Sequence, residues 1–450
     1  MNMKMPTIFK PVEKPPRPKR YIPVSQKFTY SHIVAMIWMI TSIAISLPWV
    51  YQLGAYITVP IALLIIAGIA YIPGYFNAFM VSSLLFDKQP VIKESFPTEP
   101  ITILIACYNE EKGIEMTLEY IKKQDYTGDV RVIVIDNNSS DKTAEIAMSA
   151  GVELEMNVKV IQEPNPGKHH ALNTALNYVD TDLVITLDAD TLLQKSAVRK
   201  IVGRMISSPS DVCAVAGTVL VRNSRGKFLA KMQEWDYFLG IASIKRLQGL
   251  FQGTLVAQGA FSIYETNAVR LVNGWPDAIG EDIVLTWRLL SNNRKVYFEP
   301  MAVAFTEVPE SFRHFFRQRS RWARGMVEAL KVVKPWQQSS PYTKYLTGAN
   351  LVMPYLDIVY TLIWIPGLVL ALFGYYWIVG AYTLLVLPLA MLVNYILYRY
   401  QKHVFEELNL YIRKNILGFI AFVLFYQILM SPISVWGYCQ EVFKLKRIWK

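Results

Sequence analysis

Charged residues are scarce in this sequence. Lys, Arg, Asp and Glu make up 18% of its 450 residues, and hydrophobic residues make up 53%. An average soluble domain carries about 25% charged residues. The deficit predicts a protein that lies partly in a membrane. The apolar residues concentrate at 30–86 and 346–440, whereas the middle of the chain has the composition of an ordinary soluble domain.

Cysteine is also rare. The three cysteines, Cys107, Cys213 and Cys439, are widely spaced. An odd number at such spacings excludes a disulfide framework and a cysteine-based metal cluster, and it suits a reducing compartment. We expect no cleavable signal peptide, because the first apolar run begins only near residue 32, after a Pro-rich charged tail, and lacks a small-residue cleavage pattern.

The formal net charge is +11, and the basic residues are clustered. One group precedes the first apolar run and another ends the chain, namely Lys10, Lys14, Arg17, Lys19 and Arg20, and Lys444, Lys446, Arg447 and Lys450. Both groups fit the excess of Lys and Arg on the cytosolic flanks of membrane helices. A third group, Arg313–Arg324, lies in the middle of the chain. We therefore expect a lipid bilayer as partner and no nucleic acid.

Two apolar runs before the middle domain, Ile33–Tyr51 and Ile57–Met80, have the roughly 20 residues that a helix needs to cross a bilayer. Residues 52–56 leave room only for a short external turn. With the basic tail, residues 1–30, in the cytosol, two crossings within 31–86 return the chain to the cytosol. The expected arrangement is a multi-pass protein of the cell membrane with a cytosolic domain at 98–335.

The C-terminal apolar block, residues 346–443, predicts a further helical pair over Leu351–Phe373 and Tyr376–Tyr398. The basic segment 399–414 is expected to be a cytosolic loop. The last run, Ile416–Val435, contains Pro432, and a full crossing there would leave the basic C-terminus outside. The sequence leaves open whether this run crosses the bilayer or lies partly in its interface.

Two segments of the middle domain are amphipathic, Lys227–Leu250 and Phe312–Val332. Each mixes aromatic residues with Lys, Arg or Gln, which fits a helix lying flat on the inner leaflet. A core helix of the domain fits the same pattern, and both readings stay open.

Strands alternate with helices through the first part of the middle domain, which predicts an α/β, Rossmann-like domain with a mainly parallel sheet. Continuous apolar runs such as ITILIAC are typical of strands buried on both faces. The expected strands are 101–107, 129–135, 158–162 and 183–187, and the expected helices are 110–124, 139–150 and 168–178.

Polar residues follow three of these strands directly. They are Tyr108, Asn109 and Glu110 after the first strand, Asp136, Asn137 and Asn138 after the second, and Asp188, Ala189 and Asp190 after the fourth. In open parallel sheets, ligands bind beyond the carboxyl ends of the strands. Mg²⁺ prefers carboxylates together with phosphate oxygens. We therefore predict a divalent-cation site at Asp188 and Asp190.

The segments CYNEE, IDNNSSDKT, NPGKHHALN, LDAD, GED and QRSRW occur in the order typical of family 2 glycosyltransferases, and residues 98–335 resemble that family. The resemblance implies a GT-A fold. The GED and QRSRW segments followed by apolar runs resemble synthases that extend a polysaccharide and export it. Among these, the chain is most similar to poly-β-1,6-N-acetyl-D-glucosamine synthases, with hyaluronan, chitin-oligosaccharide and cellulose synthases as relatives.

This resemblance implies roles for particular residues. Asp282, with Glu281 beside it, would be the general base, and Mg²⁺ or Mn²⁺ would bind Asp190 with support from Asp188. In QRSRW, Gln318, Arg321 and Trp322 share one helix face, and they would bind the diphosphate and the acceptor. Donor-binding residues would be Cys107, Tyr108, Asn109, Glu110, Asp136, Asn137, Lys168, Asp188, Ala189 and Asp190, and Gln258 and Gly259 would lie near the acceptor sugar.

One position departs from the family. Related enzymes often carry Asp where this chain has Asn137, although an amide can still bond a uracil edge. Cys107 also has a simpler reading as a small buried residue.

The implied reaction is processive, inverting transfer from a UDP-sugar, with UDP-N-acetylglucosamine preferred, to a growing polysaccharide, and an accessory export or regulatory protein is a further expected partner. Transfer of a single sugar to a polyprenyl-phosphate lipid is one alternative, and synthesis of a polymer of the hyaluronan, chitin or cellulose type is another. A membrane scaffold with an inactive transferase domain is a further reading, which the intact acidic motifs disfavour.

Overall fold

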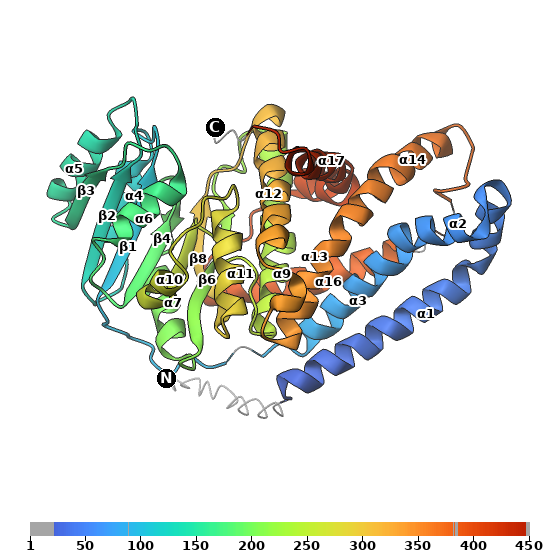
Figure 1. Cartoon of the computed structure of the whole chain (residues 1–450), viewed down its shortest axis with the longest axis horizontal. Helices are drawn as coiled ribbons and strands as arrows, with labels where there is room; N and C mark the ends of the chain where they lie inside the picture. The colour runs from blue at the N-terminus through green and yellow to red at the C-terminus, as the bar shows by residue number, and fades with distance from the viewer. Residues whose placement is uncertain (1–21, 89, 381, 383–385, 447–450) are drawn as a thin grey trace, which may run out of the picture.

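The computed structural model describes residues 22–88, 90–380, 382 and 386–446. It consists of a sheet domain and a set of long helices beside it (Figure 1). Most residues of the predicted basic tail, and the last four residues of the chain, lie outside the described residues.

The sheet domain is built on eight strands in the order β3-β2-β1-β4-β7-β6-β8-β5. Their bounds are β1 Ile101–Cys107, β2 Val130–Asp136, β3 Asn157–Gln162, β4 Leu183–Leu187, β5 Leu192–Leu193, β6 Val212–Val221, β7 Phe261–Glu265 and β8 Lys295–Thr306. Strands β3, β2, β1 and β4 are parallel, as the sequence predicts. Strand β7 runs antiparallel to β4 and β6, and the short strand β5 runs antiparallel to β8. The α/β prediction is confirmed, with a mixed second half.

Helices cover both faces of the sheet and bury its apolar strands. They are α4 Ile114–Lys122, α5 Thr143–Glu153, α6 Lys168–Leu176, α7 Ala197–Ile206, α10 Thr266–Leu271 and α11 Glu281–Ser291. Isoleucines of β1 such as Ile103 and Ile105 are fully buried on one face, and Leu104 is buried on the other. This two-sided burial is what the continuous apolar run of β1 requires.

The N-terminal apolar runs form two long helices. Helix α1 spans Val24–Ile57, and the second helix is built from α2 Val59–Ile66, the π-helical turn η1 Ala67–Tyr71 and α3 Ile72–Leu85. The chain reverses at Thr58, which has a φ of 82°, so the turn expected at 52–56 is instead helical. The π-helical turn lies just before Pro73, a residue that lacks the N–H needed by a regular helix.

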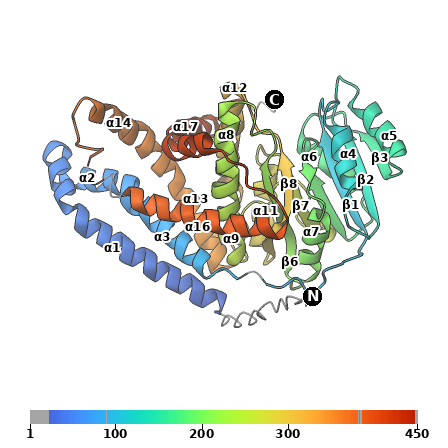
Figure 2. The same cartoon turned by 180° about the vertical axis from the view of Figure 1, so that it is seen from behind.

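The C-terminal helices differ from the expectation. Helix α13 Pro341–Val359, the π-helical turn η4 Tyr360–Trp364 and α14 Ile365–Leu372 form one long apolar element. Residues 376–380 of the predicted helix Tyr376–Tyr398 are not helical, and residues 381 and 383–385 lie outside the described residues. The next described helix, α16, spans Val386–Glu407 and continues past Tyr398 into the segment predicted as a loop. Figure 2 shows α16 from behind, beside α3. Pro354 and Pro432 lie inside helices without ending them.

Within the described part of the chain, four helices are long and apolar enough to cross a membrane: 24–57, 59–85, 341–372 and 416–442. The last of these is α17, Ile416–Val442.

The two amphipathic segments are helical. The first is α8 Phe228–Trp235, the π-helical turn η2 Asp236–Ile241 and α9 Ala242–Leu250, and the second is α12 Phe312–Val332. Helices α8 and α12 both pack against α17 (Figure 2). They therefore join the sheet domain to an apolar helix, and Met232 of α8 and Phe315 of α12 are buried in a cluster with residues of α17.

Candidate active site

The polar strand ends lie together at one edge of the sheet. Cys107 at the end of β1 pairs with Asp136 at the end of β2. Strand β4, which precedes Asp188 and Asp190, lies on the other side of β1. Because parallel strands end at the same edge, three segments distant in sequence line one rim.

Asp188 and Asp190 differ in their surroundings. Asp188 Oδ1 lies 2.5 Å from the ammonium of Lys168. Asp190 Oδ1 accepts hydrogen bonds from the hydroxyls of Thr306, at 3.0 Å, and Thr191, at 3.2 Å. Burial and the neighbouring Asp188 raise the pKa of Asp190 to about 6. Two neighbouring carboxylates repel each other, and a bound cation would relieve that repulsion.

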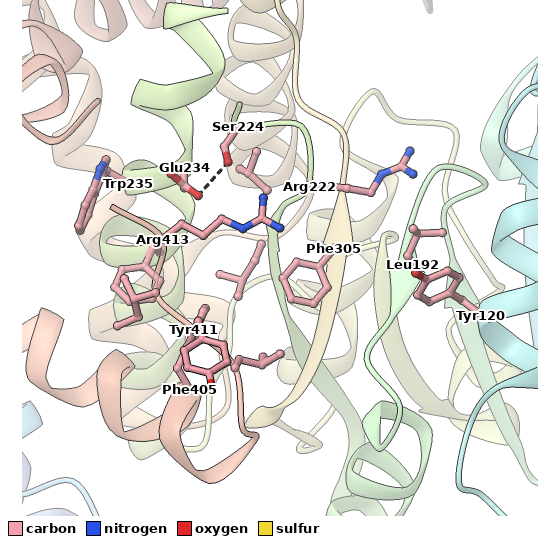
Figure 3. A pocket seen from close by; sticks show the side chains of 15 residues that line it. Tyr120, Leu192, Arg222, Ser224, Glu234, Trp235, Phe305, Phe405, Tyr411 and Arg413 are labelled. Carbon is pink, nitrogen blue, oxygen red and sulfur yellow. Dashed lines mark hydrogen bonds between the residues drawn. The ribbon is translucent and has the colours of Figure 1, made fainter. Parts of the chain in front are cut away.

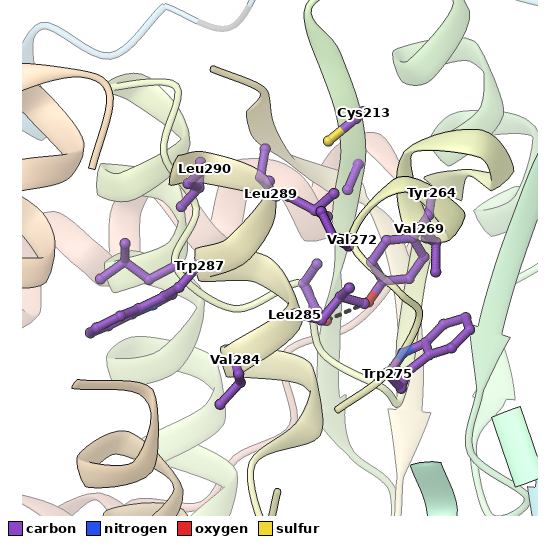
Figure 4. Close-up of a cluster of buried hydrophobic side chains, with 14 of the residues drawn as sticks. Cys213, Tyr264, Val269, Val272, Trp275, Val284, Leu285, Trp287, Leu289 and Leu290 are labelled. Carbon is purple, nitrogen blue, oxygen red and sulfur yellow. Dashed lines mark hydrogen bonds between the residues drawn. The ribbon is translucent and has the colours of Figure 1, made fainter. Parts of the chain in front are cut away.

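Glu281 and Asp282 form the first turn of α11. The helix is fixed by apolar residues that include Val284, Leu285, Trp287 and Leu290, all fully buried (Figure 4). Asp282 Oδ1 accepts from the N–H of Ile283 at 2.8 Å. Its Oδ2 accepts from the N–H of Gly259 at 3.3 Å. The carboxylate is thus oriented by main-chain donors from α11 and from the segment before β7.

Lys168 joins the two acidic pairs. Its Nζ lies 2.5 Å from Asp188 and 3.9 Å from Glu281 Oε1. Burial alone would lower the pKa of Lys168, but the carboxylates of Asp188 and Glu281 raise it above its usual value. Burial and Asp282 raise the pKa of Glu281 to about 7, although Lys168 and Arg321 oppose the rise. The DAD and GED segments therefore belong to one electrostatic cluster.

Gly259 is close to this cluster. A Cβ on Gly259 would lie 2.6 Å from Lys168 Nζ, so a larger residue would displace the ammonium. The neighbouring Gln258 donates its amide to the carbonyl of Gly217 at 2.7 Å, which holds the side chain against β6.

Helix α12 presents the QRSRW residues beside α11. Arg321 is close enough to influence the pKa of Glu281, and the side-chain oxygen of Gln318 is buried without a hydrogen-bond partner among the described residues. The Trp322 side chain is 40% exposed. Its ring is backed by the guanidinium of Arg319, whose Cζ lies 4.1 Å from the ring centroid. Arg319 itself is buried and pairs with Asp236.

The donor-binding residues predicted at the β1 and β2 ends have largely main-chain partners. Asn109, in the left-handed region at a φ of 57°, accepts from the N–H of Ser140 at 2.8 Å. Asp136 Oδ1 accepts from the N–H of Ser139 at 3.2 Å. Cys107 is buried, and burial raises the pKa of its thiol. A buried neutral thiol fits the simpler reading of Cys107 as a packing residue.

The side-chain amide of Asn137 is bonded to the loop before α6. Its Nδ2 donates to the carbonyls of Glu163 and Asn165, and its Oδ1 accepts from the N–H of Gly167 at 2.7 Å. Both amide hydrogens are therefore used to shape the loop before α6. The role of Asn137 in binding the donor base stays a prediction.

Two site residues were not predicted. Thr306 reaches Asp190 because β8 pairs with the edge strand β5, a pairing that leaves no local pattern in the sequence. Lys245 on α9 is buried and donates to the carbonyl of Val256 at 2.7 Å. Burial lowers the pKa of Lys245 to about 7, partly opposed by Asp282. The sequence offers no signal beyond a lysine in an amphipathic segment, and such a lysine is ordinarily exposed.

A cavity of about 420 Å³ lies beside β5, outside this cluster (Figure 3). Its walls are mostly apolar, and Arg222 and Arg413 are its arginines. Neither acidic pair lines it. The cavity lies between α8, the sheet edge and the segment after α16. The catalytic residues predicted from the sequence therefore do not line it.

A metal ion at this edge of the sheet would take only part of its ligands from the protein. Among the described residues, no group of three or more His, Cys, Asp or Glu side chains is arranged to hold an ion. Asp188 and Asp190 supply two carboxylates, and Mg²⁺ in nucleotide sites usually takes one or two carboxylates, substrate phosphates and waters. The residues present fit an ion that binds together with a diphosphate.

Comparisons with known proteins agree with this architecture. The family model "Glycosyltransferase like family 2" matches residues 97–325. The poly-beta-1,6-N-acetyl-D-glucosamine synthase of Staphylococcus epidermidis (strain RP62A) is 32% identical over 268 residues, which is 59% of this chain and 64% of that protein. The same-named protein of Staphylococcus aureus (strain COL) is 34% identical over 245 residues, 54% of this chain and 58% of that protein. The match thus spans less than two thirds of these relatives.

Among solved structures, the mannosyltransferase PcManGT from Pyrobaculum calidifontis, in complex with GDP-Man and Mn²⁺, is similar with a TM-score of 0.60. At 18% identity it covers 86% of this chain and 99% of that one, so the likeness shows a shared fold. Since the family model matches 229 of the 450 residues, the chain belongs to glycosyltransferase family 2 and has the GT-A fold of that family.

Proposed function

We propose that the protein is a processive, inverting glycosyltransferase that extends a β-linked polysaccharide from UDP-N-acetylglucosamine and helps to move the product across the cell membrane. The similarity to poly-beta-1,6-N-acetyl-D-glucosamine synthases over 54–59% of the chain supports the sugar. Specificity between UDP-sugars depends on a few pocket contacts.

The observation that carries the proposal is the position of Lys168 between the two acidic pairs. Its ammonium lies 2.5 Å from Asp188 and 3.9 Å from Glu281. Asp188 belongs to the pair suited to a diphosphate-bound cation, and Glu281 is adjacent to the proposed base, Asp282. A donor bound at the first pair would thus have its sugar close to the second. Such positioning converts a bimolecular reaction into a step within one complex.

Asp282 acts as the general base in this proposal. It accepts the proton of the acceptor hydroxyl while that oxygen forms a bond to the anomeric carbon of the donor sugar. The bond from the anomeric carbon to the diphosphate breaks, and its electron pair leaves with UDP. Attack opposite the leaving group inverts the anomeric configuration, which gives a β linkage from an α-linked donor. The main-chain donors at Ile283 and Gly259 orient the carboxylate for this transfer.

Asp190 and Asp188 would hold the divalent cation together with the donor. When bound, a Mg²⁺ or Mn²⁺ ion neutralises the charge that grows on the leaving diphosphate. PcManGT, which shares the fold, has a structure with Mn²⁺. Thr306 and Thr191 keep the Asp190 carboxylate in one orientation.

Helix α12 would serve the diphosphate and the acceptor. Arg321 has a planar, permanently charged group that matches phosphate oxygens. The exposed ring of Trp322 offers a flat surface for a sugar, and the buried oxygen of Gln318 could be satisfied by a ligand hydroxyl. The same helix packs against the apolar helix α17, which supports a product path that begins next to the acceptor.

Incorporation of radiolabelled UDP-sugars by the purified protein in detergent tests the proposal. The wild type should form a ladder of oligomers from UDP-N-acetylglucosamine. Asp282→Asn should bind UDP with unchanged affinity and form no polymer, since the loss of a general base typically reduces the rate by about 10²–10⁴-fold. Polymer formation by Asp282→Asn at the wild-type rate would show that another residue is the base.

Transfer of a single sugar to a lipid phosphate is the second candidate. It fits the Asp188-Ala189-Asp190 segment and the described helices that are long and apolar enough to cross a membrane, because such a transferase would need both features. Product size separates the two candidates, because a lipid carrying one sugar replaces the ladder of oligomers. Parallel assays with GDP-mannose test whether the protein accepts a guanine nucleotide sugar in place of a UDP-sugar.

A further inference from the structure

We propose that Glu328 is a positioning residue that holds the turn carrying Glu281 and Asp282 in place. The proposal rests on the function proposed above, because it assigns Glu328 to the base of that reaction. Glu328 lies on α12, beyond the QRSRW segment, and its side chain is buried. None of the sequence motifs includes it.

Glu328 contacts the start of α11 directly. Its Oε2 accepts hydrogen bonds from the N–H of Ile279 at 2.7 Å and of Gly280 at 3.4 Å. Gly280 is the N-cap residue of α11, and it provides no side chain to cap the helix. A carboxylate from another helix therefore binds the main chain immediately before α11. Negative charge is stabilising at a helix N-terminus, and hydrogen bonds to a charged acceptor are stronger than neutral ones.

One stripe of α12 carries two residues that contact this turn, Gly325 and Glu328, and a third, Arg321, whose charge acts on it. Arg321, Gly325 and Glu328 are spaced by four and three residues, so they lie above one another on the helix. Burial and Asp282 raise the pKa of Glu281, and the charge of Arg321 partly opposes that rise. A Cβ on Gly325 would lie 2.9 Å from the Cα of Gly280, so the two backbones touch. Glu328 completes the stripe at Ile279 and Gly280.

Helix α12 is itself fixed from the opposite direction. Glu441 of the apolar helix α17 pairs with Arg324, at 3.0 Å, and with Lys331, at 2.7 Å. The turn with the base is thus attached to α12, and α12 is attached to α17. Glu328 is the link of this series nearest to the proposed base, because Ile279 and Gly280 precede Glu281 and Asp282 directly.

Steady-state kinetics of Glu328→Ala and Glu328→Gln test the role. A base displaced by about 1 Å can lower the rate by about 10²-fold. We expect Glu328→Ala to reduce kcat by about that factor, with the KM for the UDP-sugar and the affinity for UDP unchanged. Glu328→Gln keeps an oxygen that accepts from the same N–H groups, so it should recover part of the lost kcat. Glu153→Ala, an exposed glutamate on α5, is the matched control.

Amide hydrogen exchange of the peptide 275–285, measured without any sugar donor, gives a readout that is independent of turnover. Glu328→Ala should accelerate exchange there, whereas Glu328→Gln and Glu153→Ala should not. Wild-type exchange and kcat in Glu328→Ala would overturn the inference, as would equal losses of kcat and UDP affinity, which indicate a general structural role. If the wild type transfers no sugar while the exchange pattern is as expected, only the proposed function fails.

Discussion

Removal of Arg319 should expose how strongly the buried charges beside Trp322 stabilise the protein. Arg319 Nη2 lies 3.0 Å from Asp236 Oδ2, and the two side chains are 2% and 10% exposed. Tyr426 of α17 donates its hydroxyl to the same carboxylate oxygen at 2.6 Å. Arg319→Met removes the cation and leaves the Asp236 carboxylate buried with one neutral donor.

The expected cost follows from that burial. Removing one partner of a buried ion pair costs about 3–5 kcal/mol, because the remaining charge is neither solvated nor paired. A change of 1 kcal/mol shifts Tm by about 2–4 °C for a domain of about 150–250 residues. Arg319→Met should therefore lower Tm by about 6–20 °C. The double variant Asp236→Asn with Arg319→Met has no unpaired charge, so it should recover at least about half of that loss.

Thermal unfolding in one detergent at a fixed scan rate, followed by tryptophan fluorescence, measures these shifts. The two single variants, the double variant and the wild type form a complete cycle. A Tm for Arg319→Met within about 2 °C of the wild type would contradict the reasoning. So would a double variant whose loss equals the sum of the single losses, because the two charges would then be independent.

Two further predictions concern the proposed catalytic cluster. Burial and Asp188 raise the pKa of Asp190 to about 6, so protonation of Asp190 should compete with Mn²⁺ as the pH falls below that value. Calorimetry should then show an apparent Kd for Mn²⁺ that rises by about tenfold per pH unit. A constant Kd would exclude Asp190 as a ligand. Gly259→Ala places a Cβ 2.6 Å from Lys168 Nζ and should lower the rate of UDP release during sugar transfer by about tenfold or more. Gly348→Ala is the control, because a Cβ there meets nothing within 4 Å, and it should leave the rate unchanged. Equal rates for the two variants would show that the position of Lys168 is unimportant.

Much of the fold is predictable from local patterns. The apolar runs of β1 and β4 have the predicted bounds, and so does α12, because continuous or periodic burial marks such elements in the sequence. Helix ends are less well predicted. Helix α16 continues past Tyr398 into a basic segment, where packing of Val404 and Phe405 outweighs the loop-like composition.

The amino-acid sequence by itself determined which residues could carry the chemistry, since the acidic, amide and aromatic residues occur in recognisable segments at strand ends and on one helix. Tertiary structure alone decided how they combine. Lys168 lies between Asp188 and Glu281. Asn137 donates a hydrogen bond to the loop before α6, and Arg319 is buried against Asp236. These contacts join residues that are far apart along the chain, and their charges and hydrogen bonds depend on distances that only packing sets.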